Sequence, residues 1–244
     1  MTKPHSMNFK RALALSAVLA LALVGTAQRG RADGDGDGRD NGRHHDNDSG
    51  NDNDAKSKIG LAIAPENLIF GHRDKQKVGY GSYLVNATAD CNGCHTADPS
   101  TQYTPGGNLN LGQHPKKVNA ATYLGGGQDF GPVPAPGFAD IVSRNITPDK
   151  TGKPAGLEFS EFKTVIRKGT DFDKWHPTCA GPPNGHCVPA PFDGSLLLVM
   201  PWPAFQDLTD YDVSAIYEYL SSVQCLEGDP GNPAGTNTNG KRCK

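Results

Sequence analysis

Hydrophobic residues are scarce in this chain of 244 residues: they make up 36% of it, and aromatic residues make up only 7%. Glycine and proline are frequent instead, with 30 and 19 residues. A composition with so few apolar and so many turn-forming residues predicts a small core. Much of the polypeptide is expected to form turns and irregular structure.

The chain also lacks an excess of charge of one sign. It has 24 Lys and Arg against 26 Asp and Glu, for a formal net charge of -2, and part of the acidity lies in one tract near the N-terminus. Proteins that bind nucleic acid carry a basic field over at least one face. No such field is present, so nucleic acid is excluded as a partner.

A long apolar run occurs only near the N-terminus. Residues 12–27 follow three basic residues, and small-x-Ala cleavage sites lie at 25–27 and 30–32. This pattern predicts a secretory signal over residues 1–32, with an uncleaved anchor as the alternative, although the run is short for a membrane span. The mature chain is therefore expected to be exported to the periplasm, with membrane association only peripheral or through such an anchor.

An acidic tract with almost no apolar residue follows the signal. Residues 33–54 are mostly Asp, Gly and Asn. This composition predicts a disordered linker over residues 33–58. The tract begins like an EF-hand loop, but His44 stands at the twelfth position, where a Glu is needed, so calcium binding is not expected. The remainder, residues 59–244, is long enough for one domain.

The most informative motif is Cys91-Asn92-Gly93-Cys94-His95. Two thiols at this spacing can each bond one haem vinyl group, and the adjacent histidine then becomes the proximal ligand of the iron. A redox dithiol or half of a zinc site are the alternatives, but no second Cys-x-x-Cys follows. The motif occurs once, so we expect one covalent haem c, attached through Cys91 and Cys94 and ligated by His95.

Methionine is rare, and this narrows the search for a second iron ligand. The chain has three methionines, two of them within the predicted signal, which leaves Met200 in an apolar, proline-punctuated loop. Met or His is the usual distal ligand of an electron-transfer haem, so Met200 is the favoured candidate. A methionine that only fills a core gap is the alternative. Three histidines are further candidates: His114, His176 and His186.

Four cysteines remain outside the motif. Of the three possible pairings, we favour Cys179 with Cys187 and Cys225 with Cys243, because each pair is close in sequence and would close a loop rich in Gly and Pro. Zinc binding is the alternative, although the spacings lack the usual Cys-x-x-Cys form. Disulfides would agree with an exported protein.

Three helices are predicted from apolar periodicity: Val78–Asp90, Phe159–Lys168, and a third capped by Thr209 and running to Val223. Gly169 supplies the stop of the second helix. We expect the third helix to pack across the first, with Gly79 and Gly81 allowing a close approach and Tyr217 or Tyr219 filling the crossing. Alternatively, these glycines only loosen the start of the first helix. The predicted fold class is all-α, with few helices and long loops around the haem.

This order of parts resembles the class I c-type cytochromes, and more closely one haem domain of the cytochrome c subunits of periplasmic alcohol, aldehyde and sugar-acid dehydrogenases. The resemblance covers about Val78 to Val223. It is carried by these segments: Gly81–Val85, Asn145–Asp149 with Thr151-Gly152, Phe159–Gly169, Met200–Trp202 and Thr209–Leu220. It implies a class I cytochrome c fold with haem on Cys91 and Cys94 and with His95 and Met200 as axial ligands.

The expected function is electron transfer and not catalysis. A thioether ligand raises the reduction potential relative to bis-histidine ligation, and six-coordinate iron has no open position. The expected partners are redox proteins: a dehydrogenase, a terminal oxidase or another cytochrome. The protein would be a carrier by itself or a non-catalytic subunit of a dehydrogenase. The alternative is a haem enzyme or sensor, peroxidase-like or gas-binding, with a labile distal ligand.

Further contacts to the haem are predicted from polar residues near these motifs. Pro105 is a candidate to offer its backbone carbonyl to the His95 ring. Asn145, Thr147 and Trp202 are candidates to reach the haem propionates. Each of the four has a simpler alternative as a turn or core residue.

Overall fold

The computed structural model describes residues 48–227 and 243. The predicted signal (1–32) and most of the predicted linker lie outside these residues. Among the helices in the described part of the chain, none is both long enough and apolar enough to span a bilayer.

Helix α1 (Asp48–Ile63) begins inside the predicted linker, so the linker boundary at residue 58 is not correct. Two Asp–Lys pairs at i,i+4 spacing stabilise the helix: Lys56 Nζ lies 2.6 Å from Asp52 and Lys58 Nζ 2.5 Å from Asp54. Ser57 is buried, and its hydroxyl donates a hydrogen bond of 2.7 Å to the Gln76 carbonyl. Composition alone predicted disorder because this docking onto the next helix is a tertiary contact.

Helix α2 (Lys75–Tyr83) continues into a π-helical turn, η1 (Leu84–Thr88), and then into the short helix α3 (Cys91–Cys94). The stretch formed by α2 and η1 corresponds to the first predicted helix. It starts three residues earlier, at Lys75, and ends at Thr88 instead of Asp90, before α3 begins. Asp74 sets the start, because its side chain accepts a hydrogen bond from the backbone N–H of Gln76.

The other two predicted helices are confirmed. Helix α4 (Phe159–Lys168) ends at Gly169, whose φ of 65° is left-handed. Helix α6 (Asp210–Leu220) starts at Thr209 with the expected capping box to Asp212. It stops three residues before the predicted end.

Short elements occupy the long connections. These are the 3-10 turns η2 (Pro99–Thr101) and η3 (Leu109–Leu111), helix α5 (Trp202–Phe205), and the antiparallel strands β1 (Asp129–Pro132) and β2 (Asp140–Val142). The strand pair was not predicted from the sequence. Strands of three and four residues are too short to show a period of two.

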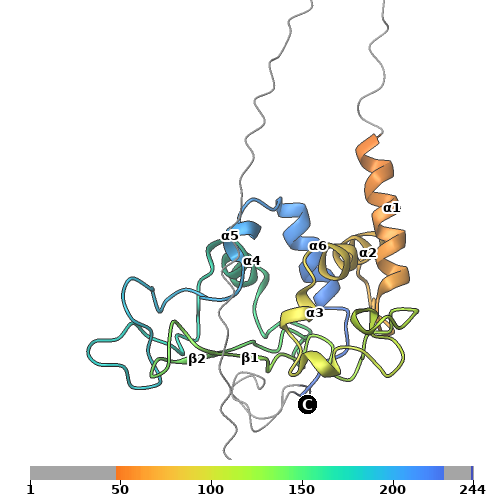
Figure 1. Ribbon diagram of the computed structural model, residues 1–244. Helices are drawn as coiled ribbons and strands as arrows, with labels where there is room; N and C mark the ends of the chain where they lie inside the picture. The colour runs from red at the N-terminus through yellow and green to blue at the C-terminus, as the bar shows by residue number, and fades with distance from the viewer. Residues whose placement is uncertain (1–47, 228–242, 244) are drawn as a thin grey trace, which may run out of the picture. The chain divides into compact units, whose positions relative to one another are not determined.

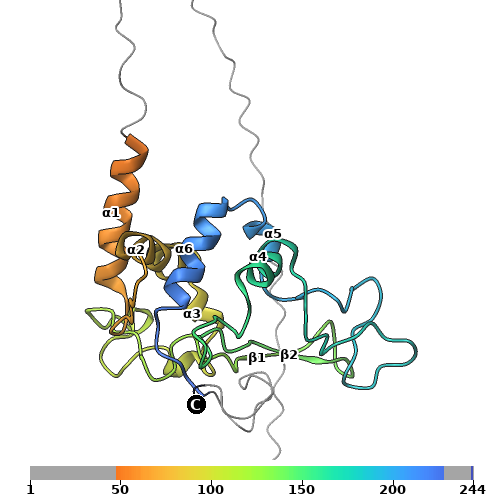
Figure 2. The ribbon, with the colours of Figure 1, turned by 180° about the vertical axis from the view of Figure 1, so that it is seen from behind.

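Helix α6 lies between the α1–α2 pair and the α4–α5 pair in both views of the ribbon (Figure 1 and Figure 2). The core forms along α6, from apolar side chains of these helices and of residues 123 and 124. Its buried members are Val78, Val85, Tyr123, Leu124, Phe162, Ile166, Val213, Ile216, Tyr219, Leu220 and Val223.

The α2–α6 crossing brings two backbones into contact at Gly81. A Cβ at this position would lie 1.9 Å from the Ala215 carbonyl oxygen and 2.8 Å from Cβ of Tyr219, which is fully buried at the crossing. Gly79 faces the other way, because a Cβ there would meet Ser57 of α1 at 2.4 Å. The two glycines therefore serve two different helix contacts, and only Gly81 has the predicted role.

We expect Gly81→Ala to lower the free energy of unfolding by about 1–3 kcal/mol, because the added methyl forces α2 and α6 apart. The gain in helix propensity, about 0.5–1 kcal/mol, offsets only part of this cost. Chemical denaturation of the haem-loaded protein measures the effect. Gly181→Ala is the control, since a Cβ there meets nothing within 4 Å. Equal stability of the two variants would contradict the packing argument.

The four cysteines outside the motif form the two pairs that the sequence favours. The sulfur atoms of Cys179 and Cys187 lie 2.01 Å apart, and those of Cys225 and Cys243 lie 1.99 Å apart. Cys91 and Cys94 form no disulfide. The two motif thiols therefore stay available to a cofactor.

Candidate haem site

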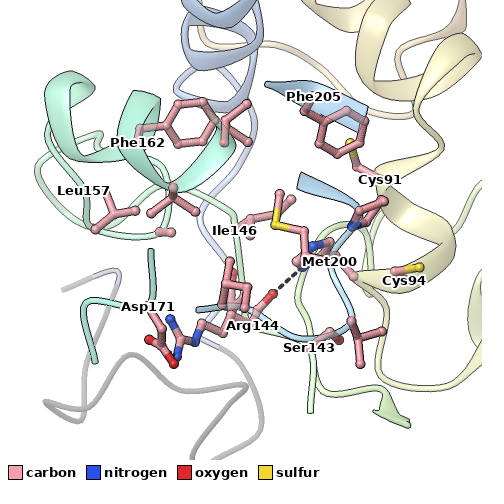
Figure 3. A pocket seen from close by; sticks show the side chains of 18 of the residues that line it. Cys91, Cys94, Ser143, Arg144, Ile146, Leu157, Phe162, Asp171, Met200 and Phe205 are labelled. Carbon is pink, nitrogen blue, oxygen red and sulfur yellow. Dashed lines mark hydrogen bonds and ion pairs between the residues drawn. The ribbon is translucent and has the colours of Figure 1, made fainter. Parts of the chain in front are cut away.

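A cavity of about 840 Å³ lies beside the Cys-x-x-Cys-His motif. Its lining includes Cys91, Cys94, His95 and Met200. Apolar side chains make up much of the remaining wall: Ile146, Leu157, Phe162, Ile166, Phe205 and Ile216. In Figure 3, Met200 lies among the labelled lining residues, with Leu157 and Phe162 on one side and Cys91 and Cys94 on the other. The size and the apolar lining are those of a small-molecule or cofactor pocket.

The turn before the motif places Cys91 and Cys94 in the wall of this cavity. The chain passes from the π-helical turn η1 to Asp90, whose φ of 44° is left-handed, and α3 begins at the next residue. Buried Asn92 fixes the turn, because its Oδ1 accepts a hydrogen bond of 2.9 Å from the backbone N–H of Leu124. Single π-helical turns often occur at functional sites.

The two thiols are not activated. Burial raises the pKa of Cys91 to about 12, with a further contribution from the charge of Asp90. Burial and Asp90 also raise the pKa of Cys94. A redox dithiol needs a thiol whose pKa is lowered. This environment therefore argues against the redox-dithiol reading of the motif.

The ring of His95 is oriented by a backbone carbonyl. Nδ1 of His95 lies 2.7 Å from the carbonyl oxygen of Arg144, a bond that Figure 3 marks with a dashed line. A carbonyl only accepts, so Nδ1 carries the proton and Nε2 keeps its lone pair. Burial lowers the pKa of His95, with the Arg144 carbonyl opposing it. A neutral ring held in this tautomer is the form that ligates a metal.

The structure assigns to Arg144 the role that the sequence suggested for Pro105. Pro105 lies in a loop that pairs with itself, since Thr104 N–H donates to the Lys117 carbonyl and Gly107 N–H to the Thr104 carbonyl. Pro105 is not part of the cavity wall. The carbonyl beside Nδ1 of His95 is that of Arg144 and not that of Pro105.

Arg144 reaches His95 through the strand pair and a close glycine contact. The N–H of Gly126 donates a hydrogen bond of 2.9 Å to the His95 carbonyl. At a φ of 68°, a Cβ on Gly126 would lie 2.2 Å from the carbonyl carbon of Arg144. The β1–β2 pair then continues through Ser143, whose N–H donates to the Gln128 carbonyl. A glycine is required here because both the backbone angle and the close approach exclude a side chain.

The three residues suggested for the propionates lie in different places. Asn145 lines the cavity, while its Oδ1 accepts hydrogen bonds from the N–H and the hydroxyl of Thr147. Thr147 and Trp202 are not part of the cavity wall. The indole N–H of Trp202 donates 3.0 Å to the Leu197 carbonyl, and its ring packs against Gly169. Trp202 thus anchors the loop that carries Met200.

Met200 lines this cavity. Hydrogen bonds connect its loop to the end of α4. The N–H of Leu197 donates a hydrogen bond of 2.7 Å to the Gly169 carbonyl, and the N–H of Trp202 donates one of 2.8 Å to the Met200 carbonyl. Of the three alternative histidines, His176 lines the cavity, whereas His114 and His186 do not. Met200 and His176 are thus the two candidates from the sequence that the fold brings to the same cavity as His95.

Sequence reasoning missed a polar cluster at the cavity wall. The guanidinium of Arg144 pairs with Asp171 at 2.7 Å and with Asp173 at 3.1 Å, and it stacks on the ring of Trp175 at 4.8 Å. All four residues line the cavity. The only local signal was the arginine that precedes the segment Asn145–Asp149. An arginine by itself does not indicate which residue it pairs with.

Comparison with known proteins gives a distant relationship. The chain is 26% identical over 147 residues to the cytochrome c subunit of a quinone-type alcohol dehydrogenase from Gluconacetobacter polyoxogenes, and equally to that from Komagataeibacter europaeus. The match covers 60% of this chain and 22% of each relative, so the chain spans about a fifth of their length. No family model and no solved structure matches. The similarity is consistent with a cytochrome c-like protein.

Proposed function

We propose that this protein is an exported monohaem c-type cytochrome that transfers single electrons. The observation that carries the proposal is the meeting of Cys91, Cys94, His95 and Met200 at one apolar cavity, although Met200 is far from the motif in sequence. The similarity to cytochrome c subunits supports it. The matching fold proposal is the all-α class I cytochrome c fold, with β1 and β2 as a local addition.

The residues present fit one haem c. Two unpaired thiols at the attachment spacing would bond the macrocycle, and a neutral His95 ring with a free Nε2 would ligate the iron. Met200 would supply a thioether as a second ligand of the iron. The cavity volume of about 840 Å³ lies within the range of cofactor sites. A bound haem would supply an iron that gains and loses one electron.

The chain contributes orientation and a dry environment. The Arg144 carbonyl holds the His95 ring, and the Trp202 anchor holds the Met200 loop. Apolar side chains of α4 and α6 keep water away, which makes each charge near the site act more strongly. Two side-chain ligands would leave no position for a substrate. This arrangement suits a carrier better than an enzyme.

The proposed setting is the periplasm, with electrons passing from a dehydrogenase or another donor to a respiratory acceptor such as a terminal oxidase or another cytochrome. The predicted export signal and the two cysteine pairs at disulfide distance support this compartment. The dehydrogenase as donor rests on the description of the relatives as subunits of an alcohol dehydrogenase.

A spectroscopic redox titration of the matured protein tests the proposal. We expect a single reversible one-electron transition and a reduced form that does not bind carbon monoxide, because His95 and Met200 would both be ligands of the iron. Rapid peroxide turnover or ready carbon monoxide binding by the wild-type protein would instead support the haem enzyme or sensor.

A further inference from the structure

Arg144 contacts two different parts of the site. Its backbone carbonyl accepts the Nδ1 proton of His95 at 2.7 Å. Its guanidinium is held at 2.7 Å by Asp171 and at 3.1 Å by Asp173. Figure 3 shows Arg144 and Asp171 side by side at the cavity. One residue therefore connects the proximal histidine to the segment after α4.

That segment, residues 170–196, is closed at its base and cross-linked within. Thr170 pairs with Leu196, and the N–H of Asp171 donates 2.8 Å to the Ser195 carbonyl. The pair Cys179–Cys187 lies inside the segment. Asp171 therefore lies at the base of the loop, where backbone hydrogen bonds constrain its position.

Asp171 has few alternatives to this contact. Only 5% of its side chain is exposed, and its Oδ1 also accepts the N–H groups of Asp173 and Lys174. A buried carboxylate requires a partner of opposite charge, and Arg144 is that partner. The planar guanidinium can pair with both carboxylates while it stacks on Trp175, which a lysine cannot do. Together these contacts hold the Arg144 side chain in a single position.

We propose that residues 170–196 act as a positioning device for the proximal ligand: Asp171, through the guanidinium of Arg144, fixes the carbonyl that accepts the His95 ring proton. This inference rests on the proposed function. A firmly held acceptor gives the His95 ring more imidazolate character, which favours the oxidised iron. Loosening Arg144 weakens this bond and makes the midpoint potential more positive.

Arg144→Lys is the decisive variant. It keeps the positive charge and the backbone carbonyl, and it removes only the planar guanidinium that pairs with both Asp171 and Asp173. In the reduced, haem-loaded protein, we expect solvent exchange of the His95 Nδ1 proton, followed by NMR, to accelerate about tenfold, the equivalent of one ordinary hydrogen bond. The midpoint potential should become more positive.

Arg167→Lys is the matched control. Arg167 makes an arginine–aspartate contact of the same length, 2.7 Å to Asp210, with similar side-chain exposure (27% against 25% for Arg144), and it does not line the cavity. We expect wild-type exchange and potential in this variant. Acceleration as large as in Arg144→Lys would overturn the inference, because general loosening would then explain both.

Asp171→Asn serves if Arg144→Lys does not fold, with the same expected acceleration of exchange. Wild-type exchange in whichever variant folds overturns the positioning role while leaving electron transfer intact. A wild-type protein without covalent haem, or without a reversible titration, would remove the proposed function, and the inference would fall with it.

Discussion

Replacing Met200 by alanine is expected to leave one coordination position of the haem iron without a protein ligand. The oxidised wild-type protein should show the weak near-infrared charge-transfer band of methionine ligation, and Met200→Ala should lose it completely. The reduced variant should then bind carbon monoxide, one molecule per haem, where the wild type binds none. Absorption spectra of both oxidation states, with and without carbon monoxide, measure both effects.

Val199→Ala is the control for this experiment, because Val199 adjoins Met200 in the same loop and also lines the cavity. It should keep the band and exclude carbon monoxide. A wild-type protein without the band would contradict ligation by Met200. His176→Ala would then be the variant to examine, since His176 lines the same cavity.

Replacing both Cys91 and Cys94 by serine is expected to abolish covalent attachment of the cofactor. Each thiol would form one bond to a haem vinyl group, so the single variants should retain one bond and the double variant none. Mass spectrometry of the denatured chain, together with haem staining, reads this directly. The haem signal of the double variant should fall to background.

The matched control is the double serine variant of Cys179 and Cys187, which pair with each other and lie outside the cavity wall. It should keep its covalent haem. Haem still bound to the denatured Cys91/Cys94 double variant would rule out thioether attachment at this motif.

Local signals were enough to predict several elements. Helix α4 has its predicted bounds and ends at Gly169, and helix α6 starts at its predicted cap, Thr209. The pairs Cys179–Cys187 and Cys225–Cys243 were favoured because each closes a short loop. These features depend on residues a few positions apart, and such interactions can be read along the chain.

Contacts between distant segments could not be predicted in this way. Pro105 was a reasonable candidate as the carbonyl partner of His95, yet the fold brings Arg144 there, by way of Gly126 and the β1–β2 pair. The buried hydroxyl pair of Tyr123 and Tyr219, 2.8 Å apart, likewise joins a loop to α6 without any local signal.

Residue type and spacing were enough to identify the Cys-x-x-Cys-His motif, the order of helices α2, α4 and α6, and the scarcity of methionine that points to Met200. The extension of α1 into the acidic tract, and the contacts of Arg144 with both His95 and Asp171, depend on how distant parts of the chain pack together. The physical reason is the same in each case. Burial of a charge or of a backbone polar group imposes a partner, and which partner is within reach depends on how the chain folds back.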